Sequence, residues 1–122
     1  MSLESTNSIG KAGESHACTH LEKLGFKIRD RNWRHIHDEL DIIAENETFI
    51  IFVEVKTRKN NNYGNPEAFV TRKKQAFIIR AANEYLIRKK LDKEARFDIV
   101  AVTGLDENCE IVHIPNAFYP IV

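Results

Sequence analysis

The sequence predicts a single α/β domain over residues 1–122, in which a small mixed β-sheet carries a helix on each face. Three observations predict this class. Two segments place apolar residues at helical spacing, five short segments resemble strands, and their order is helix, three strands, helix, two strands. Because the second helix lies between two strand segments, we expect it to join parallel neighbours as a crossover. A length of 122 residues fits one domain.

The first half of the chain begins with a helix predicted from Ser8 to Leu24, which ends before Gly25. Residues 1–7 are expected to form a flexible terminus. Residues 26–28 alternate as a short strand, and residues 29–38 are expected to form a loop or a ragged strand.

A hairpin follows, in which residues 40–44 and the very apolar residues 49–56 are predicted to pair. If the chain turns at Asn46-Glu47, residue 41 faces residue 52, and residue 54 is its diagonal neighbour. This register decides which side chains meet, because a slip of one residue moves a side chain to the other face.

The second half begins with a loop over residues 57–70, which is rich in Asn, Gly and Pro. Thr71 is a good N-cap for a long helix that reaches about Leu91. Residues 97–103 and 110–114 are predicted to form the last two strands, and the two prolines that follow discourage further regular structure.

The charge is unevenly distributed, although 18 Lys+Arg balance 18 Asp+Glu. Residues 1–55 hold 6 basic and 10 acidic residues (−4), residues 56–96 hold 12 and 4 (+8), and residues 97–122 hold 0 and 4 (−4). A basic middle third can mark a face for a polyanion, and the alternative is an ordinary solvated helix surface.

Membrane and secreted classes are not favoured. No run approaches the roughly 18 apolar residues that a membrane span needs, and the start has no apolar signal core. Cys18 and Cys109 stand far apart and outside any metal-binding spacing, so we interpret them as free thiols. We therefore expect a cytoplasmic protein that does not enter a membrane.

The most informative residues are carboxylates in apolar surroundings. Glu54 and Lys56 end the apolar third strand on one face, and Asp41 interrupts its apolar partner. On the first helix, Glu14 lies near the apolar stripe, and Gly10 and Gly13 beside it would permit a close approach to the sheet. A buried carboxylate costs several kcal/mol unless a cation or hydrogen bonds compensate it.

This pattern suggests a site for a hard cation. Mg²⁺ prefers oxygen ligands and commonly takes one or two carboxylates plus waters, so Asp41, Glu54 and the Val55 carbonyl are its candidate ligands, with Mn²⁺ as a substitute. Lys56 would orient the attacking water or stabilise the transition state. The alternative is an exposed Glu54–Lys56 pair with Asp41 near the turn.

A histidine pair and a tryptophan are two further candidates for binding residues. His16 and His20 have the i, i+4 spacing of a zinc pair, but the sequence places no third ligand, so we interpret them as ordinary histidines. Trp33 lies among arginines, where it either stacks on a base or packs at the edge of the core.

The strings GKAGESHACTHLEKLGF, RNWRHIHDELDIIA, FIIFVEVKTRKNNNYGNPEAFVTRKKQ, AANEYL and RFDIVAV together resemble the YraN family. That family is assigned to the restriction-endonuclease-like, PD-(D/E)xK nuclease superfamily, so the resemblance implies a restriction-endonuclease-like core. This sequence departs from the family's pattern at Asp38, where the family usually has glycine. Among the superfamily's better-understood members are Holliday-junction resolvases.

The resemblance implies a role for each matching position. Asp41, Glu54 and Lys56 match the catalytic motif, and Glu14 matches the helix acid. Glu39 belongs to the same motif and would act on the site only through the residues that form it. The residues expected to contact nucleic acid are Arg58, Arg72, Lys73, Lys74 and Gln75.

The sequence thus predicts a Mg²⁺-dependent deoxyribonuclease that cuts phosphodiester bonds, in structured or branched DNA by analogy with the resolvases. The same analogy suggests a homodimer. The alternatives are a non-catalytic accessory protein that binds nucleic acid and a nuclease that acts on RNA.

Overall fold

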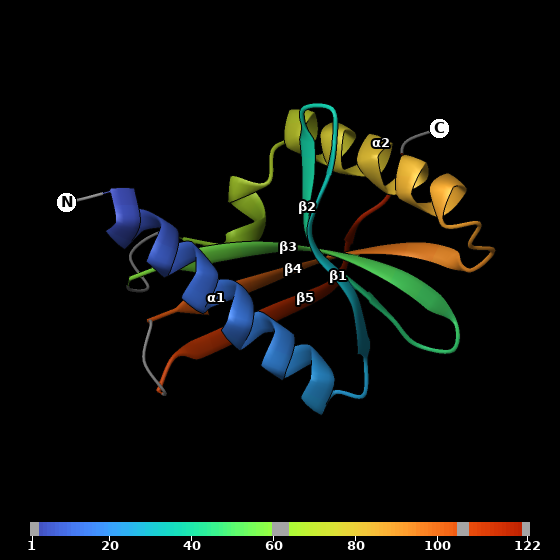
Figure 1. The fold of residues 1–122 in the computed structure, drawn as a ribbon. Coiled ribbons are helices and arrows are strands. Elements are labelled where there is room, and N and C mark those ends of the chain that lie inside the picture. Colours follow the sequence, from blue (N-terminus) through green and yellow to red (C-terminus); the bar gives the residue numbers. More distant parts are fainter. Residues whose placement is uncertain (1–2, 60–63, 105–107, 121–122) are drawn as a thin grey trace.

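The computed structural model describes residues 3–59, 64–104 and 108–120. It is an α/β structure in which a five-stranded sheet in the order β1-β2-β3-β4-β5 lies between two helices (Figure 1). The elements are α1 (Leu3–Lys23), β1 (Lys27–His35), β2 (Asp38–Glu45), β3 (Phe49–Arg58), the 3-10 helix η1 (Pro66–Phe69), α2 (Arg72–Arg88), β4 (Glu94–Thr103) and β5 (Glu110–Phe118). The α/β class and the element order predicted from the sequence are confirmed.

The sheet is mixed because one of its strand pairs is parallel. β3 and β4 run parallel with Glu54 opposite Ile99, while the pairs β1–β2, β2–β3 and β4–β5 are antiparallel. α2 connects β3 to β4, so it forms the crossover that two parallel neighbours require.

Each face of the sheet has its own apolar core. On one face, α1 buries Ala17 and Leu21 against Ile51 and Val100. On the other face, α2 packs against a second cluster, whose largest buried side chain is Tyr85. Successive side chains of a central strand therefore face opposite cores. A carboxylate at one of these positions must be compensated by a cation or by hydrogen bonds inside the protein.

Several boundaries differ from the prediction. β1 is a full strand from Lys27 to His35, because Trp33 and Ile28 pack against the two cores on opposite faces. β5 runs to Phe118 through Pro115, and a proline is tolerated there because β5 is an edge strand. α1 begins at Leu3 rather than at Ser8, and α2 ends at Arg88 rather than near Leu91. Residues 1–2 of the predicted flexible terminus and 60–63 of the predicted loop lie outside the described residues.

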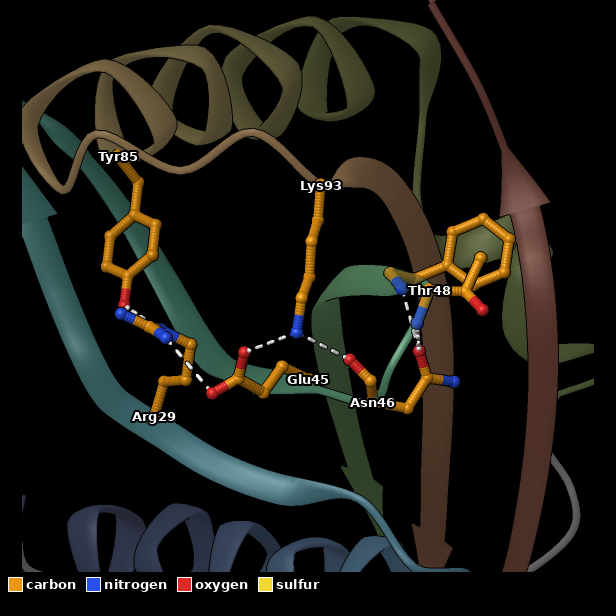
Figure 2. Close-up of polar contacts among 7 residues, drawn as sticks. Arg29, Glu45, Asn46, Thr48, Tyr85 and Lys93 are labelled. Carbon is orange, nitrogen blue, oxygen red and sulfur yellow. Dashed lines mark hydrogen bonds and ion pairs between the residues drawn. The ribbon is translucent and has the colours of Figure 1, made fainter.

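The β2–β3 turn fixes the register of the hairpin. Asn46 Oδ1 accepts hydrogen bonds from the backbone N–H groups of Thr48 (2.9 Å) and Phe49 (2.7 Å), as Figure 2 shows. Lys93 holds the turn from outside by donating to Glu45 Oε2 at 3.0 Å and to the Asn46 carbonyl at 2.8 Å.

The predicted pairing of residue 41 with residue 52 is therefore wrong by two positions. The turn uses Asn46 as an Asx-type turn residue, and the strands pair as Glu45 with Ile50 and Ile42 with Val53. Continued by one step beyond Ile42, this register would set residue 41 opposite residue 54.

Among the described residues, neither helix is both long and apolar enough to span a membrane.

Candidate functional site

Asp41 and Glu54 face one another where β2 and β3 leave the apolar core. Asp41 Oδ2 accepts a hydrogen bond of 2.9 Å from the backbone N–H of Val55, which ties the acid of β2 to the strand that carries Glu54. Asp41 and Glu54 lie close enough for each to act on the pKa of the other. The sequence prediction that these two carboxylates meet is thus supported by the geometry, although through a different register.

The two acids are held in an environment that disfavours their charge. Only 6% of Glu54 is exposed. Burial, and then the charge of Glu54, raises the pKa of Asp41 from 3.8 to about 7. Burial likewise raises the pKa of Glu54, against the opposing influence of Lys74, Lys56 and the contact with Asp41.

Two ammonium groups approach the same oxygen of this pair. Lys74 Nζ lies 3.7 Å from Glu54 Oε1, and Lys56 Nζ lies 4.0 Å from it. Lys56 stands two residues beyond Glu54 on β3, as the E-x-K spacing predicts, whereas Lys74 comes from the first turn of α2. The structure therefore puts Lys74, predicted only as a phosphate contact, beside the acids.

Glu14 reaches the site from α1. A Cβ atom placed on Gly13 would lie 2.1 Å from Thr57 Oγ1, so only glycine lets the helix come this close to β3. Burial, and then the charge of Asp41, raises the pKa of Glu14. Its Oε1 atom is buried and has no hydrogen-bond partner among the described residues, which is costly for a carboxylate oxygen.

The predicted phosphate contacts divide into two groups. Arg72 and Lys73 are exposed on the first turn of α2. Arg58 instead donates to the Gly64 carbonyl at 2.6 Å and to Thr103 Oγ1 at 3.3 Å, and Gln75 donates to the Val70 carbonyl at 3.1 Å. In this structure, Arg58 and Gln75 therefore brace the segment that leads into α2.

Asp38 and Glu39 each have a cationic partner outside the acid pair, although the charge of Glu39 still raises the pKa of Asp41. Glu39 pairs with Arg34 at 3.1 Å, and Asp38 accepts both hydrogen bonds of the Arg80 guanidinium, at 2.9 and 3.0 Å. The extra carboxylate at position 38 thus anchors the β1–β2 hairpin to α2 and does not join the candidate site.

The donor set suits a hard divalent cation that keeps several waters. The orphaned Glu14 oxygen and the raised pKa values of Asp41 and Glu54 mark carboxylates that Lys56 and Lys74 compensate only in part. No three histidine, cysteine or carboxylate side chains within the described ranges converge into a complete ligand set. Asp41 and Glu54 would therefore hold the ion with water, which is the usual pattern for Mg²⁺.

A third buried acid, Asp98, was missed by the sequence analysis. Its carboxylate accepts from Arg96 at 2.9 and 2.8 Å, from the backbone N–H of Asn116 at 3.0 Å, and lies 2.8 Å from His113 Nε2. Burial would raise the pKa of Asp98, but His113, Arg96 and Asn116 outweigh it and hold that pKa below its usual value. The signal was available, because Asp98 interrupts the apolar run of β4 just as Glu54 interrupts β3.

The histidines and the tryptophan find structural partners. His20 lies 3.1 Å from His113 across α1 and β5, and so reaches the Asp98 cluster. Trp33 packs edge-on against Tyr85, with ring centroids 5.2 Å apart. Trp33 thus lies at the edge of the core, which is one of its two predicted roles.

Comparison with known proteins agrees with the motifs. The model of the uncharacterised protein family UPF0102 matches residues 13–102, which include Glu14, Asp41, Glu54 and Lys56. A UPF0102 protein of Bacteroides thetaiotaomicron is 46% identical over 114 residues, 93% of this chain and 94% of the relative. UPF0102 proteins of Geobacter metallireducens (45% over 119 residues, 97% of each chain) and Flavobacterium johnsoniae (43% over 117 residues, 93% and 95%) are also similar. The chain therefore belongs to the UPF0102 family, the YraN-like family that its motifs predict.

Proposed function

We propose that this protein is a metal-dependent nuclease with a restriction-endonuclease-like core, and that DNA is its substrate. The observation that carries the proposal is the pair of neighbouring carboxylates, the half-buried Asp41 and the buried Glu54, with Lys56 beside them. Such a pair lowers stability unless a cation joins it, which is typical of a functional site rather than of a structural one. The helix, three strands, helix, two strands order is compatible with that core.

Each side chain has a separate task in this proposal. Asp41 and Glu54 would hold the Mg²⁺ or Mn²⁺ ion, and Val55 keeps Asp41 in place through its N–H. The bound ion would supply Lewis-acid polarisation of a phosphoryl oxygen and a more acidic water. Lys56, 4.0 Å from Glu54, offers a fixed positive charge to the attacking water or to the phosphate as negative charge develops.

The nucleic acid would approach over the start of α2. Arg72 and Lys73 are exposed there, and Thr71 caps the helix by accepting from the Lys74 N–H at 3.2 Å. Backbone N–H groups and the helix dipole add to the attraction for phosphate at a helix N-terminus. A homodimer would supply two such sites if both strands of a branched substrate are cut.

The test is a cleavage assay on duplex, single-stranded, flap and four-way-junction DNA and on RNA, with Mg²⁺, Mn²⁺ or EDTA. Asp41→Asn, Glu54→Gln and Lys56→Ala are each expected to lower the rate at least about 100-fold, because each removes charge that acts on the reacting phosphate. Glu84→Gln is the control, since it makes the same change at a carboxylate outside the site that pairs with Arg88 on α2 at 2.7 Å.

Cleavage that persists in EDTA or in these three variants would refute the metal-dependent mechanism. Binding that weakens steeply with salt, without cutting under any condition, would instead support the accessory protein that binds nucleic acid.

A further inference from the structure

The two lysines that share Glu54 Oε1 differ in how they reach it. Lys56 extends from β3, where the sheet fixes its backbone next to Glu54. Lys74 crosses from α2, comes closer, at 3.7 Å against 4.0 Å, and keeps 43% of its side chain exposed. The second ammonium in the site is therefore the more accessible of the two.

We propose that Lys74 is a placeholder for the cation: a positioning residue that neutralises the acid pair in the metal-free protein and turns to a substrate phosphate once the metal binds. The inference rests on the proposed nuclease function and adds a regulation of that site, since it couples metal binding to nucleic-acid binding through one side chain.

The charges explain why the ammonium would leave. Lys74 faces both acids, since its charge lowers the pKa of Asp41 as well as that of Glu54. An ion held between these carboxylates would stand within a few ångströms of Lys74 Nζ, and like charges at such distances repel even in water. Metal and ammonium therefore compete for Glu54.

The local structure lets the side chain move alone. Thr71 Oγ1 accepts from the Lys74 N–H at 3.2 Å, and the Thr71 carbonyl accepts from the Gln75 N–H at 2.8 Å, so the first turn of α2 is fixed. Lysine carries its charge on a flexible four-carbon stem and can reorient without moving the helix. Arg72 and Lys73, exposed in the same turn, mark the face to which it would turn.

The experiment measures Mn²⁺ affinity by calorimetry for the wild type, Lys74→Met and Lys73→Met, with and without a phosphorothioate duplex that resists cleavage. Without the duplex, Lys74→Met is expected to bind Mn²⁺ about tenfold more tightly than the wild type. The duplex should tighten Mn²⁺ binding about tenfold in the wild type, but less than about threefold in Lys74→Met, because the coupling is reciprocal and passes through Lys74.

Lys73→Met is the matched control. It removes the same charge one residue away, but Lys73 Nζ lies over the Phe77 ring, 6.0 Å from its centroid, so Mn²⁺ affinity without duplex should stay within about twofold. Because both lysine side chains reach solvent, we expect both variants to fold. Thermal unfolding verifies this.

If Lys74→Met binds Mn²⁺ no more tightly than Lys73→Met and keeps the wild-type response to the duplex, the placeholder role is wrong while the nuclease site stands. If the wild type binds no Mn²⁺, or if Asp41→Asn binds it equally well, the proposed function itself fails. The two failures are thus told apart by the same titrations.

Discussion

Asp41→Asn is expected to stabilise the metal-free protein by about 2 kcal/mol at pH 8, although it removes a central residue of the proposed site. A pKa raised from 3.8 to about 7 means that ionising Asp41 costs free energy in the folded state. At about 1.4 kcal/mol per unit, the shift corresponds to roughly 4 kcal/mol, of which we expect about half because Glu54 titrates with it. Asparagine keeps the shape and avoids that charge.

The raised pKa of Asp41 also determines how the stability of the folded protein changes with pH. A carboxyl whose pKa is raised by folding keeps its proton more tightly in the folded state, so wild-type stability falls as pH rises from about 4 to about 7. Asp41→Asn lacks this decrease, and the two proteins should converge near pH 4. The free energy of unfolding, measured in urea with EDTA between pH 4 and pH 8, tests this.

Magnesium provides the second half of this test. An ion that binds only the folded state raises the unfolding temperature, so Mg²⁺ should stabilise the wild type and leave Asp41→Asn unchanged. Glu84→Gln, which changes a carboxylate outside the site that pairs with Arg88 on α2, should keep both the pH profile and the Mg²⁺ response. Destabilisation of Asp41→Asn at pH 8 would show that Asp41 has a structural role instead.

Asp98→Ala is expected to have the largest effect on stability, a loss of roughly 3–5 kcal/mol. The variant leaves Arg96 and His113 without the buried carboxylate that both contact at 2.8 Å. In a domain of this size, such a loss lowers the unfolding temperature by roughly 10–20 °C. Thermal unfolding followed by circular dichroism at pH 7 measures it.

Asp98 should also respond to pH in the opposite sense to Asp41. Its pKa is lowered by folding, so its contribution to stability is present at neutral pH and is lost as pH falls below its usual range. The exposed pair Arg88 and Glu84 is the control, because Glu84→Ala should cost less than about 1 kcal/mol. A neutral Asp98→Ala would mean that the buried cluster contributes nothing to the fold.

The contrast between these acids shows what the sequence could predict. Both Glu54 and Asp98 interrupt an apolar strand, and both are buried, but the sequence prediction used this pattern only for Glu54. The pattern does not tell which is compensated, because Asp98 depends on His113 and Asn116, which are distant in sequence and come from β5. Only the tertiary fold separates the structural acid from the candidate functional one.

The predicted hairpin register is wrong because the turn depends on side-chain contacts that the sequence alone does not specify. A two-residue turn at Asn46-Glu47 is a sound expectation, but the Asn46 side chain accepts two backbone N–H groups and Lys93, from beyond α2, holds the turn. In the same way, α2 brings Lys74 to Glu54 over a crossover that spacing alone does not specify. The elements were predictable, whereas contacts between them depend on turn and crossover geometry.

The position of both acids on one hairpin also has a kinetic consequence. Asp41 and Glu54 stand 13 positions apart in the chain, so they meet as soon as β2 pairs with β3. Hairpins form within about 1–10 μs, whereas the parallel β3–β4 pair must wait for the closure of a much longer loop. The two carboxylates are therefore neighbours from the first steps of folding, before the helices bury them and before α2 brings Lys74 to Glu54.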